Sequence, residues 1–200
     1  MSRAIIGEHP TGHTYGVSLA ACDKKTDSEF QHRELTENGK IDSFLAHTVN
    51  ALRLHHLSDE ALERRKVHIA SFKIKGLDYS RLSPYPRDDN VRKGNFAEVV
   101  TAEYLEATTS TSLPVYRLRY NTNVNQSMKG DDVLLFDLDS DPIRIIVAES
   151  KFRKIPSTAP IKEMIDGLQR SHSGALPVSL TFVSDRLFEE GKAELGKKSS

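Results

Sequence analysis

The feature that most constrains the fold is a short apolar segment, residues 143–148, that ends abruptly in the charged triplet Glu149-Ser150-Lys151. Its length and its content of isoleucine and valine predict a central β-strand. A second predicted strand, residues 132–137, precedes it, and the residues between the two strands have turn composition. Because the start of one strand of an antiparallel hairpin lies beside the end of the other, Asp132 and Glu149 are expected to meet at one edge.

The charged triplet places Lys151 beside these two acids. Side chains alternate along a strand, so Glu149 and Lys151 are expected to point the same way. Two carboxylates, assisted by the carbonyl of Ser150, form a site for a hard divalent cation such as Mg²⁺ and its bound water. A surface ion pair at a strand end is the simpler alternative. Acid-x-Lys also occurs at Asp23 and Glu190, but neither follows an apolar strand, and both are expected to be solvated surface.

A third acid is expected from the helix predicted over residues 90–107. Glu98 follows Phe96 and precedes two valines, so it is a candidate for an inward-facing carboxylate, although a surface position is nearly as consistent with the pattern. Asp131 is a second candidate metal ligand beside Asp132. Asp132 is preferred because the apolar strand begins directly after it, whereas Asp131 is more typical of a turn-capping aspartate.

Residues 83–90 contain two prolines and a polar cluster, which predicts a boundary between an N-terminal α+β region (1–89) and a second domain (90–200). In the first region we expect a strand at 15–21, helices at 41–56 and 58–65, and a strand at 67–76. The helix at 41–56 is amphipathic and is a candidate for partner docking or for packing on its own domain. In the second region, further strands are expected at 115–120 and 176–183, and helices at 158–171 and 185–195. The order is α-β-β-β-α-β followed by a helix, an α/β class with a mixed sheet.

This order and these residues resemble the PD-(D/E)xK nuclease superfamily, which has a restriction-endonuclease-like core. Four segments carry a narrower likeness: residues 94–98, 121–123, 129–132 and 148–152. They resemble the HamA/AbpA C-terminal domain family of anti-phage nuclease subunits, found in systems such as Hachiman. The resemblance implies Mg²⁺-dependent DNA cleavage, with Mn²⁺ as a possible substitute, and a helicase subunit as partner. It implies Asp132 and Glu149 as metal ligands, Lys151 as the catalytic lysine and Glu98 as an accessory acid. The superfamily's proline before the aspartate is absent, which leaves the choice between Asp131 and Asp132 open.

Several basic or polar residues are candidate DNA contacts. Arg153 and Lys154 follow the triplet, Lys129 precedes the aspartates, and Arg117 and Arg119 are expected on one face of a strand, where simple solvation is the alternative. Gln169 lies on the helix after the triplet. Contacts of such residues with phosphates give affinity without sequence preference.

Composition excludes other classes. Lys and Arg number 28 and Asp and Glu number 28, so the net charge is zero and the chain is not a polybasic nucleic-acid packaging protein. The single cysteine, Cys22, excludes an internal disulfide framework and fits a cytoplasmic location. No apolar run is long enough to span a membrane. The eight histidines lack zinc-site spacing, and no phosphate-binding glycine loop is present.

Two functions are therefore expected. The first is a metal-dependent DNA endonuclease that acts as the effector of an anti-phage system. The second is a nuclease-like module that binds DNA or regulates a helicase without cutting. Uptake of Mg²⁺ or Mn²⁺ separates the two, because only the endonuclease requires it.

Overall fold

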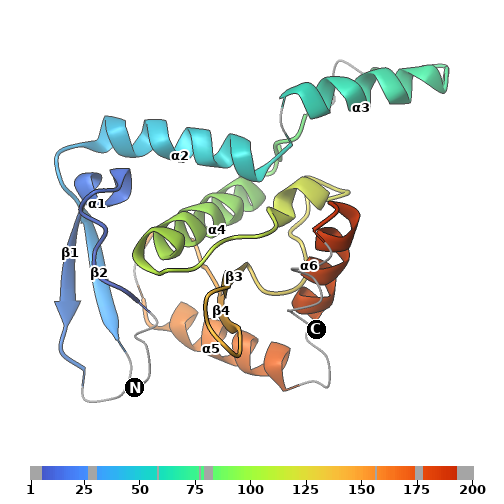
Figure 1. The fold of residues 1–200 in the computed structure, drawn as a ribbon. Coiled ribbons are helices and arrows are strands. Elements are labelled where there is room, and N and C mark those ends of the chain that lie inside the picture. Colours follow the sequence, from blue (N-terminus) through green and yellow to red (C-terminus); the bar gives the residue numbers. More distant parts are fainter. Residues whose placement is uncertain are drawn as a thin grey trace.

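The computed structural model describes residues 6–26, 31–57, 59–76, 78, 83–155, 157–173 and 178–192. The chain begins with the short helix α1 (Thr14–Ser18) and an antiparallel hairpin of β1 (Leu19–Lys24) and β2 (His32–Glu37). Helix α2 (Ile41–His55) follows and packs against α1. Figure 1 shows the hairpin standing at one end of the molecule, beside α1 and the start of α2.

Helix α3 (Asp59–Ser71) projects away from the rest of the molecule (Figure 1). Val67 is 70% exposed and Phe72, just after the helix, is 61% exposed. The sequence predicted a strand at 67–76, and this prediction was wrong: residues 67–71 belong to α3, and residues 72–76 form no strand. The apolar side chains of this segment are not buried, so no sheet contact is available to favour extended backbone over helix.

The second half begins with α4 (Asp89–Thr108), whose first turn is capped by Asp88 accepting from the N–H groups of Asn90 and Val91. The 3₁₀ turn η2 (Arg117–Tyr120) and the antiparallel strands β3 (Val133–Asp137) and β4 (Arg144–Ala148) follow. Helices α5 (Ala159–His172) and α6 (Val178–Glu189) complete the described chain. Helix α4 packs along α2 and against β3, so it connects the two halves.

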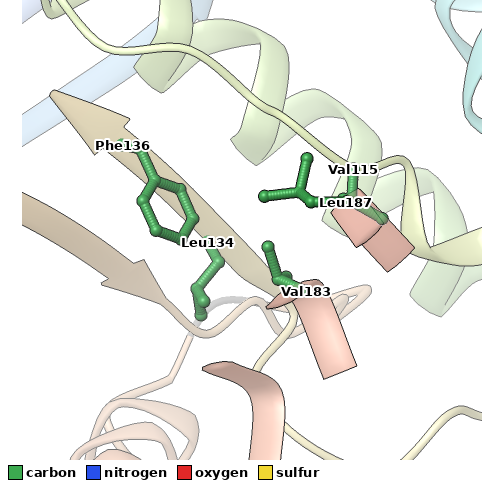
Figure 2. Packing of buried hydrophobic residues seen from close by; sticks show 5 residues of the cluster. All are labelled: Val115, Leu134, Phe136, Val183 and Leu187. Carbon is green, nitrogen blue, oxygen red and sulfur yellow. The ribbon is translucent and has the colours of Figure 1, made fainter. Parts of the chain in front are cut away.

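Strand β3 is buried on both faces and carries the core. On one face Leu134 and Phe136 pack with Val115 and with Val183 and Leu187 of α6, as Figure 2 shows. On the other face Val133 and Leu135 pack with Ala102 of α4 and Ile146 of β4. Burial on both faces accounts for the continuous apolar composition of β3. The sequence predicted residues 143–148 as the central strand, and this prediction was wrong: in the described chain β4 pairs with β3 alone, and within β4 only Ile146 is fully buried.

Two predicted strands of the second region are helical instead. Residues 117–120, inside the expected strand 115–120, form η2. The expected strand 176–183 is helical from Val178 onward, and residues 176–177 lie outside the described part. Leu180, Val183 and Leu187 recur at helical spacing and pack on β3. A short apolar run such as this one is consistent with either a buried strand or a buried helix, so the sequence alone did not distinguish the two.

The expected strand at 15–21 is also partly wrong, because residues 14–18 form α1 and the strand β1 begins at Leu19. The described chain is thus a mixed α/β fold with two small antiparallel sheets, β1-β2 and β3-β4. The division into domains 1–89 and 90–200 stays a prediction. Among the described residues, no helix has the length and apolar composition needed to cross a bilayer.

Candidate active site

The edge of the β3-β4 hairpin holds the three residues that the sequence placed there. The last paired residues are Val133 and Ala148, so Asp132 and Glu149 are the next opposed positions. Asp132 Oδ2 accepts hydrogen bonds from the backbone N–H and the hydroxyl of Ser150, both at 2.9 Å. Lys151 Nζ lies 3.7 Å from Glu149 Oε2. The hairpin therefore fixes Asp132 to the strand end that carries Glu149.

Glu98 lies on the third turn of α4, and its side chain is buried. Its Oε1 lies 3.5 Å from Arg117 Nε. Burial raises the pKa of Glu98 to about 8, with Arg117 opposing this shift and the carboxylates of Asp132 and Glu149 adding to it. The ionised form of Glu98 is thus destabilised by burial and by the neighbouring acids, and a divalent cation bound nearby would stabilise it.

A single polar cleft, with a volume of about 720 Å³, brings these groups together. We call it the acidic cleft. Helix α4, the β3-β4 edge, the segment after β4 and one face of α5 contribute its walls. Its charged and amide-bearing lining side chains are Asn90, Lys93, Asn95, Glu98, Asp132, Glu149, Lys151, Arg153, Glu163 and Arg170.

The chemistry of this cleft suits a divalent cation with oxygen ligands. Burial and the neighbouring Asp132 raise the pKa of Glu149, with Lys151 opposing the shift, so the carboxylates repel one another across the cleft. Within the described ranges, no three His, Cys, Asp or Glu side chains already form a common cage. Mg²⁺ is commonly held by one or two carboxylates and several waters, so Asp132 and Glu149 fit such an ion without a third side chain.

Asp131 lies apart from the acidic cleft. Its side chain is buried, its backbone N–H donates to Ser179 Oγ at 2.8 Å, and it lines a smaller cavity of about 100 Å³. Gly130 before it has a φ of 101°, which a residue with a side chain rarely adopts. Asp132 lines both cavities, so of the two aspartates it is the one that shares a space with Glu149.

The predicted DNA contacts separate into two groups. Arg153 lines the acidic cleft and its Nη2 donates to Glu163 Oε2 at 3.0 Å. Lys129 lines the smaller cavity with the aspartates. Lys154 and Gln169 are exposed and lie outside the described lining of the cleft.

The two arginines of η2 are not on a solvated strand face. Arg117 lies beside Glu98 and donates to the backbone carbonyl of Asp131, and its side chain is 14% exposed. Arg119 donates from Nε and Nη2 to the carbonyl of Leu54, at 2.9 and 2.7 Å. Both guanidinium groups are thus engaged with the protein itself.

Sequence reasoning missed five polar residues of the cleft on its helical walls: Asn90, Lys93, Asn95, Glu163 and Arg170. Helical spacing carried a usable signal for two of them. Asn90 lies two turns before Glu98, and Arg170 lies one turn after Gly167, the only glycine of α5. A glycine inside an amphipathic helix indicates a close approach, and a Cβ at Gly167 would lie 4.0 Å from Glu149 Cδ.

Comparison with known proteins agrees with the resemblance drawn from the motifs. The HamA family model matches residues 17–198, nearly the whole chain. A curated relative, the Hachiman protein HamA of Bacillus cereus, is 34% identical over 197 residues, which cover 96% of this chain and 70% of the relative. Hachiman is an anti-phage defence system, and both matches extend through the acidic cleft and the N-terminal region. The chain therefore belongs to the HamA family and is a component of a Hachiman-type anti-phage defence system.

Proposed function

We propose that this chain is a metal-dependent DNA endonuclease of the PD-(D/E)xK type, the effector that acts with a helicase subunit in Hachiman defence. The observation that carries the proposal is the acidic cleft, in which Glu98, Asp132, Glu149 and Lys151 share one space. Phosphodiester hydrolysis needs a water delivered in line and neutralisation of the charge that develops on the phosphate. The residues of the cleft supply both requirements.

Asp132 and Glu149 would hold Mg²⁺, or Mn²⁺ in its place. The ion would supply Lewis-acid polarisation of the phosphate and a more acidic bound water. Lys151, which lies beside Glu149 and is 36% exposed, can orient the attacking water or donate to the developing oxyanion. Glu98, as an accessory acid, can hold a water or a proton behind the two ligands.

The rim of the cleft supports nucleic acid as the substrate. Lys93, Arg153 and Arg170 line the cleft together with the acids, and their charges would bind phosphates of the DNA backbone. Arg153 and Lys93 are paired with the exposed acids Glu163 and Asp89, so their charges are held at the rim. Lys129 and the exposed Lys154 and Gln169 would make outer contacts with the DNA.

The test is cleavage of plasmid DNA by the complex with the helicase subunit, in Mg²⁺ and in EDTA. Wild type should nick or cut only with the metal, and Glu149→Ala and Lys151→Ala should each lose at least about a hundredfold in rate. The chain contains its own matched control, because Lys192 Nζ lies 2.9 Å from Glu190 Oε2 in a second Glu-x-Lys triplet. Lys192→Ala should cut like wild type. Equal cutting by all four proteins, or cutting in EDTA, would refute the assignment.

A non-cleaving module that binds DNA or regulates the helicase is the second candidate. It is favoured by one observation, the zero net charge of the chain, because a weak intrinsic affinity for DNA would leave binding to a partner. Calorimetry with Mn²⁺ distinguishes the two functions. No heat of binding, together with normal association with the helicase, would favour the module, whereas binding that is lost in Asp132→Asn favours the endonuclease.

A further inference from the structure

Arg117 is placed unlike any other basic residue around the acidic cleft. Lys93, Lys151 and Arg153 have side chains that are 36% exposed or more, whereas that of Arg117 is 14% exposed. Its Nε lies 3.5 Å from Glu98 Oε1, and its Nη1 lies 3.9 Å from Asp132 Oδ1. One largely buried cation therefore faces two of the acids of the proposed metal site.

The backbone holds Arg117 in this place from two directions. Its Nη1 donates to the carbonyl of Asp131, at the start of the hairpin. Two residues later in η2, Arg119 is bonded twice to the carbonyl of Leu54, at the end of α2, and its guanidinium also stacks 4.4 Å from the centre of the Tyr116 ring. The position of Arg117 is thus set by the fold and not by the acids alone.

We infer that Arg117 is an internal counter-cation, a positioning residue that faces Glu98 and compensates the charge of Asp132 while no metal is bound, and that opposes the entry of the metal. This inference rests on the proposed metal site. A unit charge about 4 Å from a ligand oxygen weakens the binding of a second cation by at least about fivefold, even at the dielectric constant of water. The site should therefore bind the metal ion with low affinity unless Arg117 moves away or DNA phosphates add negative charge.

The experiment measures Mn²⁺ binding by calorimetry on the full chain at one pH, for wild type, Arg117→Gln and Arg117→Lys. Arg117→Gln should bind Mn²⁺ at least about fivefold more tightly, and Arg117→Lys, which keeps the charge, should bind within about twofold of wild type. A purely structural role predicts the opposite, because loosened ligands bind metal more weakly. Unchanged or weaker binding by Arg117→Gln overturns the inference.

Arg144 provides a matched control at the far end of the same hairpin. Its Nε lies 3.9 Å from Asp137 Oδ2, the same separation as that between Arg117 and Asp132. Arg144→Gln removes the same charge from an Arg–Asp pair and should leave Mn²⁺ affinity within about twofold of wild type. A gain in affinity as large as that of Arg117→Gln would overturn the inference, because it would reflect net charge alone.

A second measurement needs no charge-removing variant and serves if Arg117→Gln does not fold. In wild type, the ¹⁵Nε–¹H signal of Arg117, assigned by its loss in Arg117→Lys, should shift as diamagnetic Mg²⁺ saturates the site. A signal that does not move at saturating Mg²⁺ overturns the inference. If wild type takes up no metal at all, the proposed function fails first, so the two failures are distinguishable.

Discussion

Ser150 donates two hydrogen bonds, one from its backbone N–H and one from its hydroxyl, to the same oxygen of Asp132, each at 2.9 Å. The pair closes the open end of the β3-β4 hairpin beyond the last strand residues. It also selects which oxygen of Asp132 is left for a ligand, because Oδ2 is engaged and Oδ1 faces Arg117. The middle residue of the triplet thus orients an acid on the neighbouring strand.

Ser150→Ala should lower the free energy of unfolding by about 1–3 kcal/mol in EDTA, because one charge-assisted hydrogen bond is lost. It should also weaken Mn²⁺ binding, since Asp132 is no longer held in one orientation. Urea unfolding and calorimetry measure the two effects. Ser140→Ala is the control, because Ser140 bonds within the turn at the other end of the hairpin. It should destabilise the chain without changing metal affinity, and equal metal binding by both variants would contradict the role of Ser150.

Gly167 should tolerate substitution by alanine but not by a larger residue. A Cβ there would make ordinary contact with Glu149 at 4.0 Å, and alanine is a better helix former than glycine by about 1 kcal/mol. Gly167→Ala should therefore raise the melting temperature and keep plasmid cutting, whereas Gly167→Leu should fill the space beside Glu149 and lower the cutting rate. Thermal unfolding and the plasmid assay check this pair. Full activity in Gly167→Leu would show that α5 does not limit access to Glu149.

His56 should make stability fall on mild acidification. Its Nδ1 lies 2.8 Å from the carbonyl of Leu52, which only accepts, so its Nε2 is left to accept from Asn95 Nδ2 at 3.1 Å. Burial lowers the pKa of His56 below its usual value of 6.5, although the Leu52 bond opposes this. The unfolded chain then binds the proton first, so the contribution of His56 is present above pH 6.5 and is lost as the pH falls through the lowered pKa.

Asn95→Asp should weaken this pH dependence of stability. The new carboxylate would accept from a protonated His56 and raise its pKa, so the fall in melting temperature between pH 7.5 and 5.5 should become smaller than in wild type. Asn90→Asp makes the same charge change at an exposed position of α4 and should keep the wild-type slope. Identical slopes for all three proteins would contradict the assigned hydrogen-bonding pattern of His56.

Truncation of Leu187 should reduce the stability of the protein strongly, because this side chain is part of the core. It is 1% exposed and packs with Val115, Val183 and the β3 side chains in Figure 2. Leu187→Ala should lower the free energy of unfolding by about 2–5 kcal/mol, measured in urea. The neighbouring Phe188 is 49% exposed, and Phe188→Ala should cost much less. A small loss for Leu187→Ala would mean that α6 does not close the core over β3.

The sequence predicted the β3-β4 hairpin because every local signal agreed there: an apolar run, turn residues and acids at matching ends. The expected strands 132–137 and 143–148 differ from the observed ones by one residue. The strand expected at 115–120 was wrong because its arginines find partners far away in the chain, Glu98 for Arg117 and the Leu54 carbonyl for Arg119. Alternation along one segment contains no information about such contacts.

The convergence of Glu98 with the hairpin edge also depended on tertiary packing. Its inward position requires that α4 pack on β3, which helical periodicity allowed but did not require. The sequence analysis anticipated a contribution from the helix after the triplet, but it chose Gln169, whereas Gly167 and Arg170 of α5 line the cleft. Choosing the residue one position away is the usual consequence of fixing the helix phase from a short segment.

The attachment of η2 to α2 has a practical consequence for anyone who wishes to dissect this protein. Cutting the chain at residue 89 would deprive Arg119 of its acceptor on Leu54 and Glu103 of its histidine partner His55, which lies 2.8 Å away. It would also uncover Val99 and Leu118, which pack on Ala51. Residues 90–200 made alone would therefore be a poor substitute for the whole chain, and their inactivity would say nothing about the proposed chemistry of the acids.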